Sequence, residues 1–328
     1  MQKHSTEVID EAMEPAGPSD AIPGEKQVVT VFGVEYLHLH FPDGDDLYVT
    51  EYGRPWLGNL LPASIITDRE WFRGHSVPLS RLGPRTAATS CSFKVRTKPW
   101  HGSSLDVVFK WNRMGQEVPG ARDVESLWFA DFNSPYEEFA LLLEMRNTAY
   151  ESPGRILTHK PLAIYVPHDE IAMERVGRKA HKMQWKEDSH ADIALDRLRS
   201  YAVIYEWVKG VDAAHAAHEG MATKDAMVEL TLHADAEMKR KGFSVSDRKP
   251  HHVIVRPTAD GSVLTRREDE FAYALIDFEL LRRTPERAAA ITSAKRYAYL
   301  QEQAHRFDTN LSIPMPPHLK AVSILGVD

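Results

Sequence analysis

One short stretch of the chain, FSVSDRKPHHVIV at residues 243–255, concentrates groups that can do chemistry. Asp247 and Lys249 supply an acid and a base, and two histidines follow them directly before the apolar triplet at 253–255. The triplet predicts a short buried strand. Because such strands are usually reached through turn residues, the charged and metal-capable groups before this one indicate a functional loop.

A second aspartate stands in a matching position further along the chain. Asp277 lies in ALIDFELL, at the end of another predicted strand, and the turn signal PTADGS lies between the two strands. The turn predicts an antiparallel hairpin. Asp247 and Asp277 are therefore expected at the same edge of a small ribbon.

A lysine and a glutamate upstream add opposite charges on two other elements. Lys110 ends the apolar run VVFK inside a predicted strand, where residues two apart share a face, so Val108 lies beside it. An apolar residue and an ammonium on one face suit a slot for an adenine ring and a phosphate. Glu138 lies in the predicted helix SPYEEFALLLEMRN, on one apolar stripe with Leu142 and Met145, and therefore points inward. Because a buried carboxylate is costly unless it is paired, we expect Glu138 to pair with Lys110.

Local signals place the elements that must position these groups. Residues 27–52 and 84–111 are β-rich, and each stretch carries a hairpin signal. The first helix begins at Ser134, where a capping box is expected, and later helices begin at Thr223 and Thr284. Further strands are predicted at KPLAIYVP, YAVIYEW and FAYALIDF. Strands dominate first and helices later, which indicates an α+β fold.

Composition limits the class of protein and its partners. With 328 residues, 43% hydrophobic and 27% charged, the chain is typical of a globular protein with a large core. Its net charge of −7 disfavours broad binding to nucleic acids or anionic membranes. No apolar run reaches the roughly 18–20 residues that span a bilayer. The single cysteine, Cys91, excludes a disulfide within the chain, and we expect a cytoplasmic protein.

Taken in order, these stretches resemble the motifs of a protein-kinase-like fold over roughly residues 80–282. VVFK resembles the strand of the phosphate-pairing lysine, Lys110, and EEFALLLEMR resembles the helix whose glutamate, Glu138, pairs with it. SDRKPHH resembles the catalytic loop. The resemblance implies that Asp247 is the base that receives the acceptor proton and that Lys249 contacts the γ-phosphate.

Two further motifs extend the resemblance. VIYEWVKG resembles the hinge between two lobes, which implies that Tyr205 guards the back of the pocket and that Glu206 and Val208 offer backbone groups to adenine. IDFE resembles the metal-binding aspartate motif, with Asp277 as the Mg²⁺ ligand. ATP and Mg²⁺ are the implied cofactors.

The resemblance also implies a two-lobed organisation. We expect a tail without stable structure at 1–26 and an N-terminal lobe at 27–205, with an antiparallel sheet, one helix, an extension and an insertion. A reduced, mainly helical C-terminal lobe would follow at 206–328. The roles of 27–80 and 169–199, which lie outside the resemblance or interrupt it, stay open.

Several residues depart from the family pattern. His252 stands where an asparagine normally binds the second metal, which adds an imidazole ligand better suited to softer metals such as Mn²⁺ or Zn²⁺. Glu279 replaces the glycine after Asp-Phe and removes an easy hinge with positive φ. Val245 and Ser246 replace the residues that usually support the catalytic loop through hydrogen bonds, and Gly83 is the lone candidate for a glycine-rich loop.

Three functions follow from these features. The first is an ATP-dependent phosphotransferase whose acceptor is a hydroxyl of a sugar, a small molecule or a protein. The short segment after Glu279 resembles the atypical branch of the family, which includes RIO kinases and bacterial lipopolysaccharide-sugar kinases. The second is a pseudokinase that acts as a nucleotide-binding or protein-interaction scaffold. The third is a hydrolase that uses His251, His252 and Asp247. The sequence leaves the acceptor and the oligomeric state open.

Overall fold

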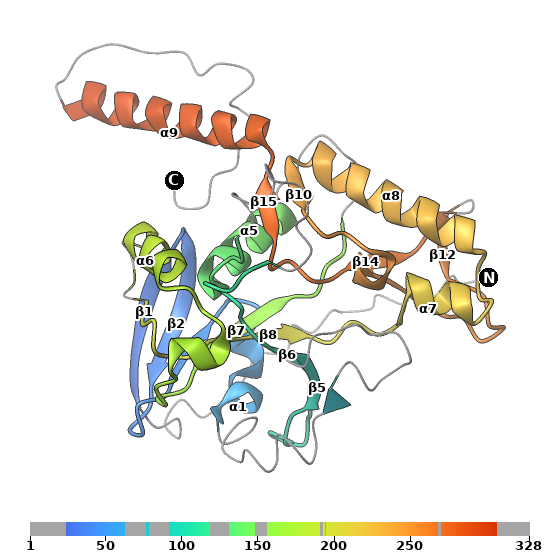
Figure 1. Ribbon diagram of the computed structural model, residues 1–328, viewed down its shortest axis with the longest axis horizontal. Coiled ribbons are helices and arrows are strands. Elements are labelled where there is room, and N and C mark those ends of the chain that lie inside the picture. The colour runs from blue at the N-terminus through green and yellow to red at the C-terminus, as the bar shows by residue number, and fades with distance from the viewer. Residues whose placement is uncertain are drawn as a thin grey trace, which may run out of the picture.

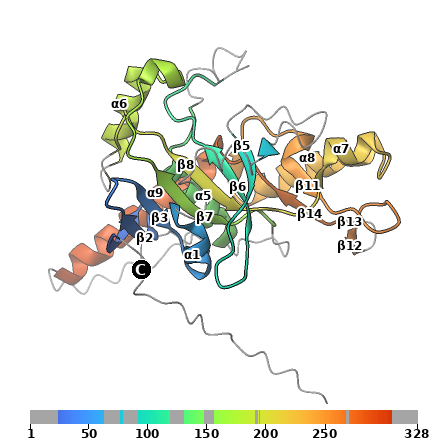
Figure 2. The same cartoon turned by 90° about the horizontal axis from the view of Figure 1, so that it is seen from below.

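An eight-stranded antiparallel sheet, in the order β1-β2-β3-β7-β8-β6-β5-β4, is built from strands that lie between residues 25 and 206 (Figures 1 and 2). The computed structural model describes residues 24–62, 77–78, 92–118, 131–147, 156–190, 193, 195–267 and 270–306. The strands of the sheet are β1 (Glu25–Val31), β2 (Val34–His40), β3 (Asp46–Val49), β4 (Val77–Pro78), β5 (Ser92–Arg96), β6 (Asp106–Trp111), β7 (Pro161–Val166) and β8 (Ala202–Glu206).

Side chains alternate across this sheet, so its strands contribute to two hydrophobic cores. Tyr36 and Tyr205 belong to the core shared with helix α5 (Pro135–Asn147). Phe109 and Ile204 belong to the core on the opposite face, where the short helix α1 (Leu57–Leu60) packs. The α+β fold with a large antiparallel sheet is thus confirmed, and the sheet separates α5 from α1.

Helix α5 begins with the predicted capping box. The backbone N–H of Ser134 donates to the Glu137 carboxylate at 2.7 Å, and the N–H of Glu137 donates to Ser134 Oγ at 3.2 Å. The predicted inward stripe is also confirmed, because Glu138, Leu142 and Met145 are all buried. The sequence therefore fixes both the start of α5 and the face that it presents to the sheet.

The second half of the chain is mainly helical and carries small sheets. Its helices are α7 (Ala213–His218), α8 (Lys224–Arg240), η5 (Pro250–His252) and α9 (Pro285–Arg306). Its strands are β9 (Val211–Asp212), β10 (Phe243–Val245), β11 (Val253–Val255), β12 (Thr265–Arg267), β13 (Glu270–Phe271), β14 (Tyr273–Leu275) and β15 (Leu281–Arg283). Figure 1 shows α7 and α8 at the opposite end of the molecule from β1 and β2. The predicted pairing of β11 with β14 is confirmed, with Val253 opposite Leu275.

The connection between the two halves runs from the end of β8 to β9. Gly210 lies in it with a φ of 150°, and a Cβ at this position would lie 2.3 Å from the carbonyl oxygen of Val255. Only glycine avoids this clash, so the connection can lie directly against β11. The N–H of Trp207 donates to the carbonyl of Asp106 at 3.0 Å, which holds the beginning of the same connection to β6.

The stretches whose roles the sequence left open contribute to the sheet and to α5. Strands β1 to β3 continue the sheet beyond β7, and β1 already begins at Glu25, inside the range assigned to a tail. Helix α6 (Ala180–Ser189) places Lys186 Nζ 2.6 Å from the Glu137 carboxylate, in the cap of α5. Gly83, Cys91 and the predicted strand before Ser92 lie outside the described residues. No helix in the described part of the chain has both the length and the apolar character needed to cross a membrane.

Candidate functional site

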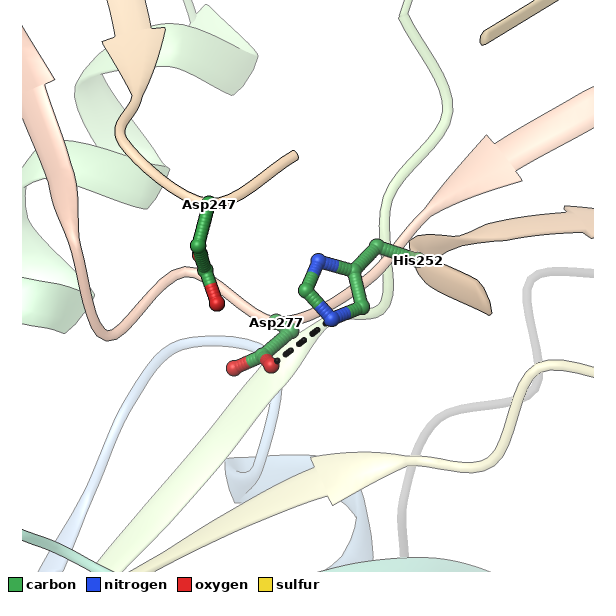
Figure 3. Close-up of side chains that lie close together, drawn as sticks. All are labelled: Asp247, His252 and Asp277. Atoms are coloured by element: carbon green, nitrogen blue, oxygen red, sulfur yellow. Dashed lines mark ion pairs between the residues drawn. The ribbon is translucent and has the colours of Figure 1, made fainter. Parts of the chain in front are cut away.

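Asp247, His252 and Asp277 converge at the edge of the β11–β14 ribbon (Figure 3). One ligand atom from each side chain lies within 4.8 Å of the others, and His252 Nε2 lies 3.3 Å from Asp277 Oδ2. His252 ends η5 directly before β11, and Asp277 follows β14, so the pairing of β11 with β14 brings these two together, while Asp247 comes from the loop after β10. The predicted proximity of the two carboxylates is confirmed, and the imidazole joins them.

The backbone of Asp277 adopts a conformation that is rare for residues with a side chain. Its φ is 66°, in the left-handed region. Such a conformation costs on the order of 1 kcal/mol and persists where the surrounding structure enforces it. The described residues with positive φ do not include Glu279, so the glutamate at the expected glycine position causes no backbone strain. The loss of a glycine hinge at position 279 stays a prediction, and the left-handed residue of this segment is Asp277, two positions earlier.

Arg248 supports the loop that carries Asp277. Its guanidinium donates to the carbonyl of Ile276 at 3.2 Å and lies 5.8 Å from the centre of the Phe278 ring. The arginine thus contacts the residues on both sides of Asp277. The sequence predicted that hydrogen-bonded support was missing at Val245 and Ser246. In the structure the support comes instead from the residue after Asp247, and its position beside the candidate base was the only signal for it.

Lys110 reaches this cluster from the large sheet but bonds to other carboxylates than expected. Its Nζ lies 2.5 Å from Asp277 Oδ1 and 2.9 Å from Glu279 Oε2. Arg113 forms a second ion pair with the Glu279 carboxylate. Among the described residues no ion pair joins Lys110 to Glu138, so the predicted pair is replaced by a pair with Glu279. The physical reason is that a glutamate at position 279 brings a carboxylate within reach of the ammonium, where glycine has none.

Glu138 is deeply buried and bonds to a phenol instead. Its relative exposure is 1%, and the Tyr205 hydroxyl donates to its Oε1 at 2.6 Å. Its Oε2 is buried and has no hydrogen-bond partner in the described part of the chain. Burial raises the pKa of Glu138 to about 7, although Lys110 and the Tyr205 hydroxyl oppose the shift. The carboxyl group therefore takes up a proton far more readily than an exposed glutamate.

The two charges at the centre of the site stabilise each other. Burial alone would lower the pKa of Lys110, but Asp277, Glu279 and Glu138 raise it well above its usual value. Burial alone would raise the pKa of Asp277, but Lys110 and His252 hold it well below its usual range. Lys110 is therefore a cation and Asp277 an anion at neutral pH.

An aromatic wall stands behind Lys110. The His159 ring stacks on Tyr205 with centroids 3.7 Å apart and lies 5.4 Å from Phe278. Burial lowers the pKa of His159 to about 3, so the ring is neutral. Val108 lies opposite Tyr205 in the pairing of β6 with β8, next to Lys110 along the same strand face. The predicted arrangement of an apolar residue and a lysine on one face is confirmed.

The remaining predicted residues lie around these groups. The N–H of Glu206 donates to the carbonyl of Lys160 at 3.0 Å, and the Glu206 side chain pairs with the same lysine at 3.1 Å. Val208 is half-buried and follows directly in the connection to the second half. Lys249 is exposed, with its Nζ 3.3 Å from Asp247 Oδ2. The structure therefore brings Lys110, Asp247 and Asp277 into one region, and it places Glu206 at the end of β8 and Val208 in the connection that follows.

Kinases occur among the solved structures that are similar to this chain. A crystal structure of monomeric WbdD is 16% identical with a TM-score of 0.30, and the match covers 74% of this chain and 42% of that one. A structure of the bifunctional kinase-methyltransferase WbdD is 14% identical with a TM-score of 0.29, covering 70% and 38%. The BubR1 kinase domain is 12% identical with a TM-score of 0.32, covering 80% and 53%.

The chain spans between about two fifths and about half of the length of these proteins. At these TM-scores the overlaps are too small to assign a fold or a function. No protein-family model matches the chain, and no curated protein matches its sequence.

Proposed function

We propose that the chain is an ATP-dependent phosphotransferase with a two-lobed, kinase-like fold of the atypical type. The observation that carries this proposal is the position of Lys110. A lysine from the large sheet lies 2.5 Å from Asp277, which itself belongs to a cluster with Asp247 and His252 on the other half of the chain. Phosphoryl transfer needs this combination, because its catalysis consists mainly of positioning and of neutralising phosphate charge.

The donor set of the cluster fits a divalent cation. Two carboxylates and one imidazole can each direct one atom to a common point, and the Nε2 of His252 already faces Asp277. Oxygen donors suit Mg²⁺, and the added nitrogen donor shifts the preference towards Mn²⁺. Asp277 and His252 would hold the ion, which supplies charge neutralisation at the phosphates when it is bound.

The chain's own residues then take distinct roles. Asp247 accepts the proton of the acceptor hydroxyl. Lys110 and Lys249 neutralise phosphate charge, with Glu138 behind Lys110. Val108 and Tyr205 cover the adenine slot, and the backbone of Glu206 and Val208 faces the adenine edge. The acceptor is a hydroxyl on a sugar, a small molecule or a protein.

Metal-dependent nucleotide binding tests the first half of this proposal. We expect a non-hydrolysable ATP analogue to raise the melting temperature of the wild type with Mn²⁺ or Mg²⁺ and much less with EDTA. The Asp277→Asn variant should lose this metal-dependent rise, because a neutral amide binds the cation weakly. Asp188→Asn, which changes an exposed aspartate outside the cluster, should keep it. The absence of any nucleotide effect on the wild type would refute the proposal.

Turnover tests the second half. Transfer of the γ-phosphate to pools of sugars, small alcohols and peptides is measured with the wild type and with Asp247→Asn. A lost general base lowers the rate by about 10²–10⁴-fold, while the affinity for the ATP analogue should stay the same. Equal rates in the two proteins would rule out Asp247 as the base.

A scaffold without catalytic activity is the second candidate, and the Lys110–Asp277 contact favours it. In this contact the phosphate-binding cation and the metal-binding anion neutralise each other. A pseudokinase would keep that contact in the presence of nucleotide and metal. Nucleotide binding without metal dependence and without turnover would support this alternative.

A further inference from the structure

The carboxylate that holds Lys110 belongs to Glu279. Glu279 is 3% exposed, and its Oε2 lies 2.9 Å from Lys110 Nζ. Arg113 contacts both oxygens of the same carboxylate: its terminal nitrogen pairs with Oε1, and its Nε donates to Oε2 at 3.2 Å. The Arg113 guanidinium is itself held 4.1 Å from the centre of the Phe132 ring. Glu279 is therefore fixed between two cations, one of which is anchored by packing.

Glu138, which the sequence pattern predicted as the carboxylate that pairs with Lys110, bonds to Tyr205 instead. Its Oε1 accepts the Tyr205 hydroxyl at 2.6 Å, and its Oε2 has no hydrogen-bond partner in the described part of the chain. The raised pKa of Glu138, about 7, further weakens it as a counter-ion, because a protonated carboxyl group carries no charge. Glu138 contributes to the field around Lys110 without bonding to it.

Asp277 cannot be the lasting partner of Lys110 if the proposed function holds. A cation bound by Asp277 and His252 competes with Lys110 for the Asp277 oxygens, and the bound phosphates attract the ammonium. Lys110 then leaves Asp277 for a phosphate. Glu279 lies on the Arg113 side of the lysine and belongs to no metal-sized cluster among the described residues, so it can keep its contact.

We propose that Glu279, held by Arg113, is the positioning residue that keeps Lys110 directed at the phosphates of the nucleotide. This inference rests on the proposed function. It reverses the meaning of the substitution at position 279, since the glutamate that replaces glycine would supply the lysine's anchor. In that case no carboxylate from helix α5 is needed to bond Lys110.

Nucleotide affinity tests the proposal. Isothermal titration measures the binding of a Mn²⁺-bound non-hydrolysable ATP analogue and of adenosine, which has no phosphates. Glu279→Gln should lower the affinity for the analogue by about ten-fold or more, as the loss of a charge-assisted bond predicts. Adenosine affinity should stay within about two-fold, because only the phosphate contact depends on Lys110. Glu279→Asp, which keeps the charge, should restore part of the loss.

Two further variants separate positioning from general damage. Glu144→Gln removes another buried carboxylate, one that bonds Arg283 and Arg287 and contacts neither Lys110 nor Glu279 in any described ion pair, and should leave both affinities unchanged. Adding Glu279→Gln to Lys110→Met should cause no further loss of affinity for the ATP analogue, because Glu279 acts on the nucleotide only through Lys110. The proposal would be overturned if the two substitutions lowered the analogue affinity additively in the double variant. It would also be overturned if Glu138→Gln lowered that affinity more than Glu279→Gln does.

A nucleotide-free measurement keeps the inference testable if the proposed function fails. The Lys110 ammonium group is observed by ¹⁵N-lysine NMR and assigned from its absence in Lys110→Met. Salt-bridged buried ammonium groups exchange slowly with water, so its signal should be visible in the wild type. Glu279→Gln should shift or broaden this signal clearly more than Glu138→Gln does. An unchanged signal in Glu279→Gln would refute the anchor even if nucleotide binds, and a missing nucleotide response alone would refute only the function.

Discussion

At the scale of single residues, the site is built from buried charges that are matched in pairs, with one exception. Lys110 faces Asp277 and Glu279, and Arg113 faces Glu279. Among the carboxylates of the site, Glu138 is the one that has a buried oxygen without a partner in the described part of the chain. An uncompensated buried carboxylate destabilises the folded state when it is ionised. The folded protein therefore favours a protonated Glu138 at pH values where the unfolded chain has lost that proton.

This imbalance predicts a specific dependence of stability on pH. The pKa of Glu138 rises from 4.5 to about 7 on folding, so the folded state holds one proton more than the unfolded state between these values. The contribution of this group to the free energy of unfolding is therefore fully present below the lower pKa and is lost as the pH rises through the higher one. Glu138→Gln lacks this titration. Between about pH 5 and about pH 8 the free energy of unfolding of the variant should therefore rise by about 2.5 kcal/mol relative to that of the wild type.

Urea unfolding at both pH values measures that gain. All other titrating groups are common to the two proteins, so the change in their difference isolates Glu138. A difference that stays constant with pH would mean that Glu138 has an ordinary pKa in the folded protein.

At the scale of elements, helix α5 is held at its beginning by three groups from different parts of the chain. Ser134 Oγ accepts the N–H of Glu137 and lies 2.6 Å from His190 Nε2, while Lys186 bonds the Glu137 carboxylate. The insertion at 169–199 thus contributes both His190 and Lys186 to the cap. The start of α5 is therefore fixed by tertiary contacts as well as by local capping.

Removing this cap should cost more than removing an ordinary one. Ser134→Ala loses the cap bond, worth about 1 kcal/mol, and also removes the Ser134 hydroxyl from the Nε2 of buried His190, which adds about 1–3 kcal/mol. Thr223→Ala, at the exposed start of α8, loses only the bond from the N–H of Ala226. Equilibrium unfolding should show a loss for Ser134→Ala about twice that for Thr223→Ala or larger. Equal losses would show that His190 adds nothing to the cap.

The sequence predicted elements where the signal was local. The caps at Ser134 and Thr223 use side chains three residues from their partners. The pairing of β11 with β14 was predicted from a turn signal between them, although β12 and β13 also lie in that connection. The expected proximity of Asp247 and Asp277 followed from that predicted pairing. Such features depend on neighbours along the chain, so pattern and chemistry suffice to predict them.

The sequence did not predict contacts that depend on a choice between distant neighbours. Lys110 has Glu138 and Glu279 in the same region, and which carboxylate it bonds depends on where the Tyr205 hydroxyl and Arg113 lie. The position of Glu279 was interpreted only as the loss of a glycine. The support by Arg248 was missed for the same reason, since its acceptor, the carbonyl of Ile276, is distant in the sequence.

At the scale of the whole molecule, the N-terminal strands and the site share one core. Tyr36 of β2 packs edge to face on Tyr136 of α5, with ring centroids 5.8 Å apart, and Tyr48 of β3 packs on the same ring at 5.3 Å. Helix α5 carries Glu138 two residues later. Residues 24–49 are thus part of the packing that positions α5, and the sheet is continuous from β1 to β4.

Two substitutions at Tyr36 test whether the molecule unfolds as this shared core implies. Tyr36→Ala leaves a cavity against α5 and should cost about 3–5 kcal/mol. Tyr36→Phe should be neutral or stabilising, because the buried Tyr36 hydroxyl has no hydrogen-bond partner in the described part of the chain and its removal leaves no group unpaired. Circular dichroism and tryptophan fluorescence should report the same single transition in every variant, since one core joins both halves. If Tyr36→Ala instead produced a separate early transition while the remaining one kept the wild-type midpoint, β1 to β3 would form an independent unit, and α5 would be positioned without them.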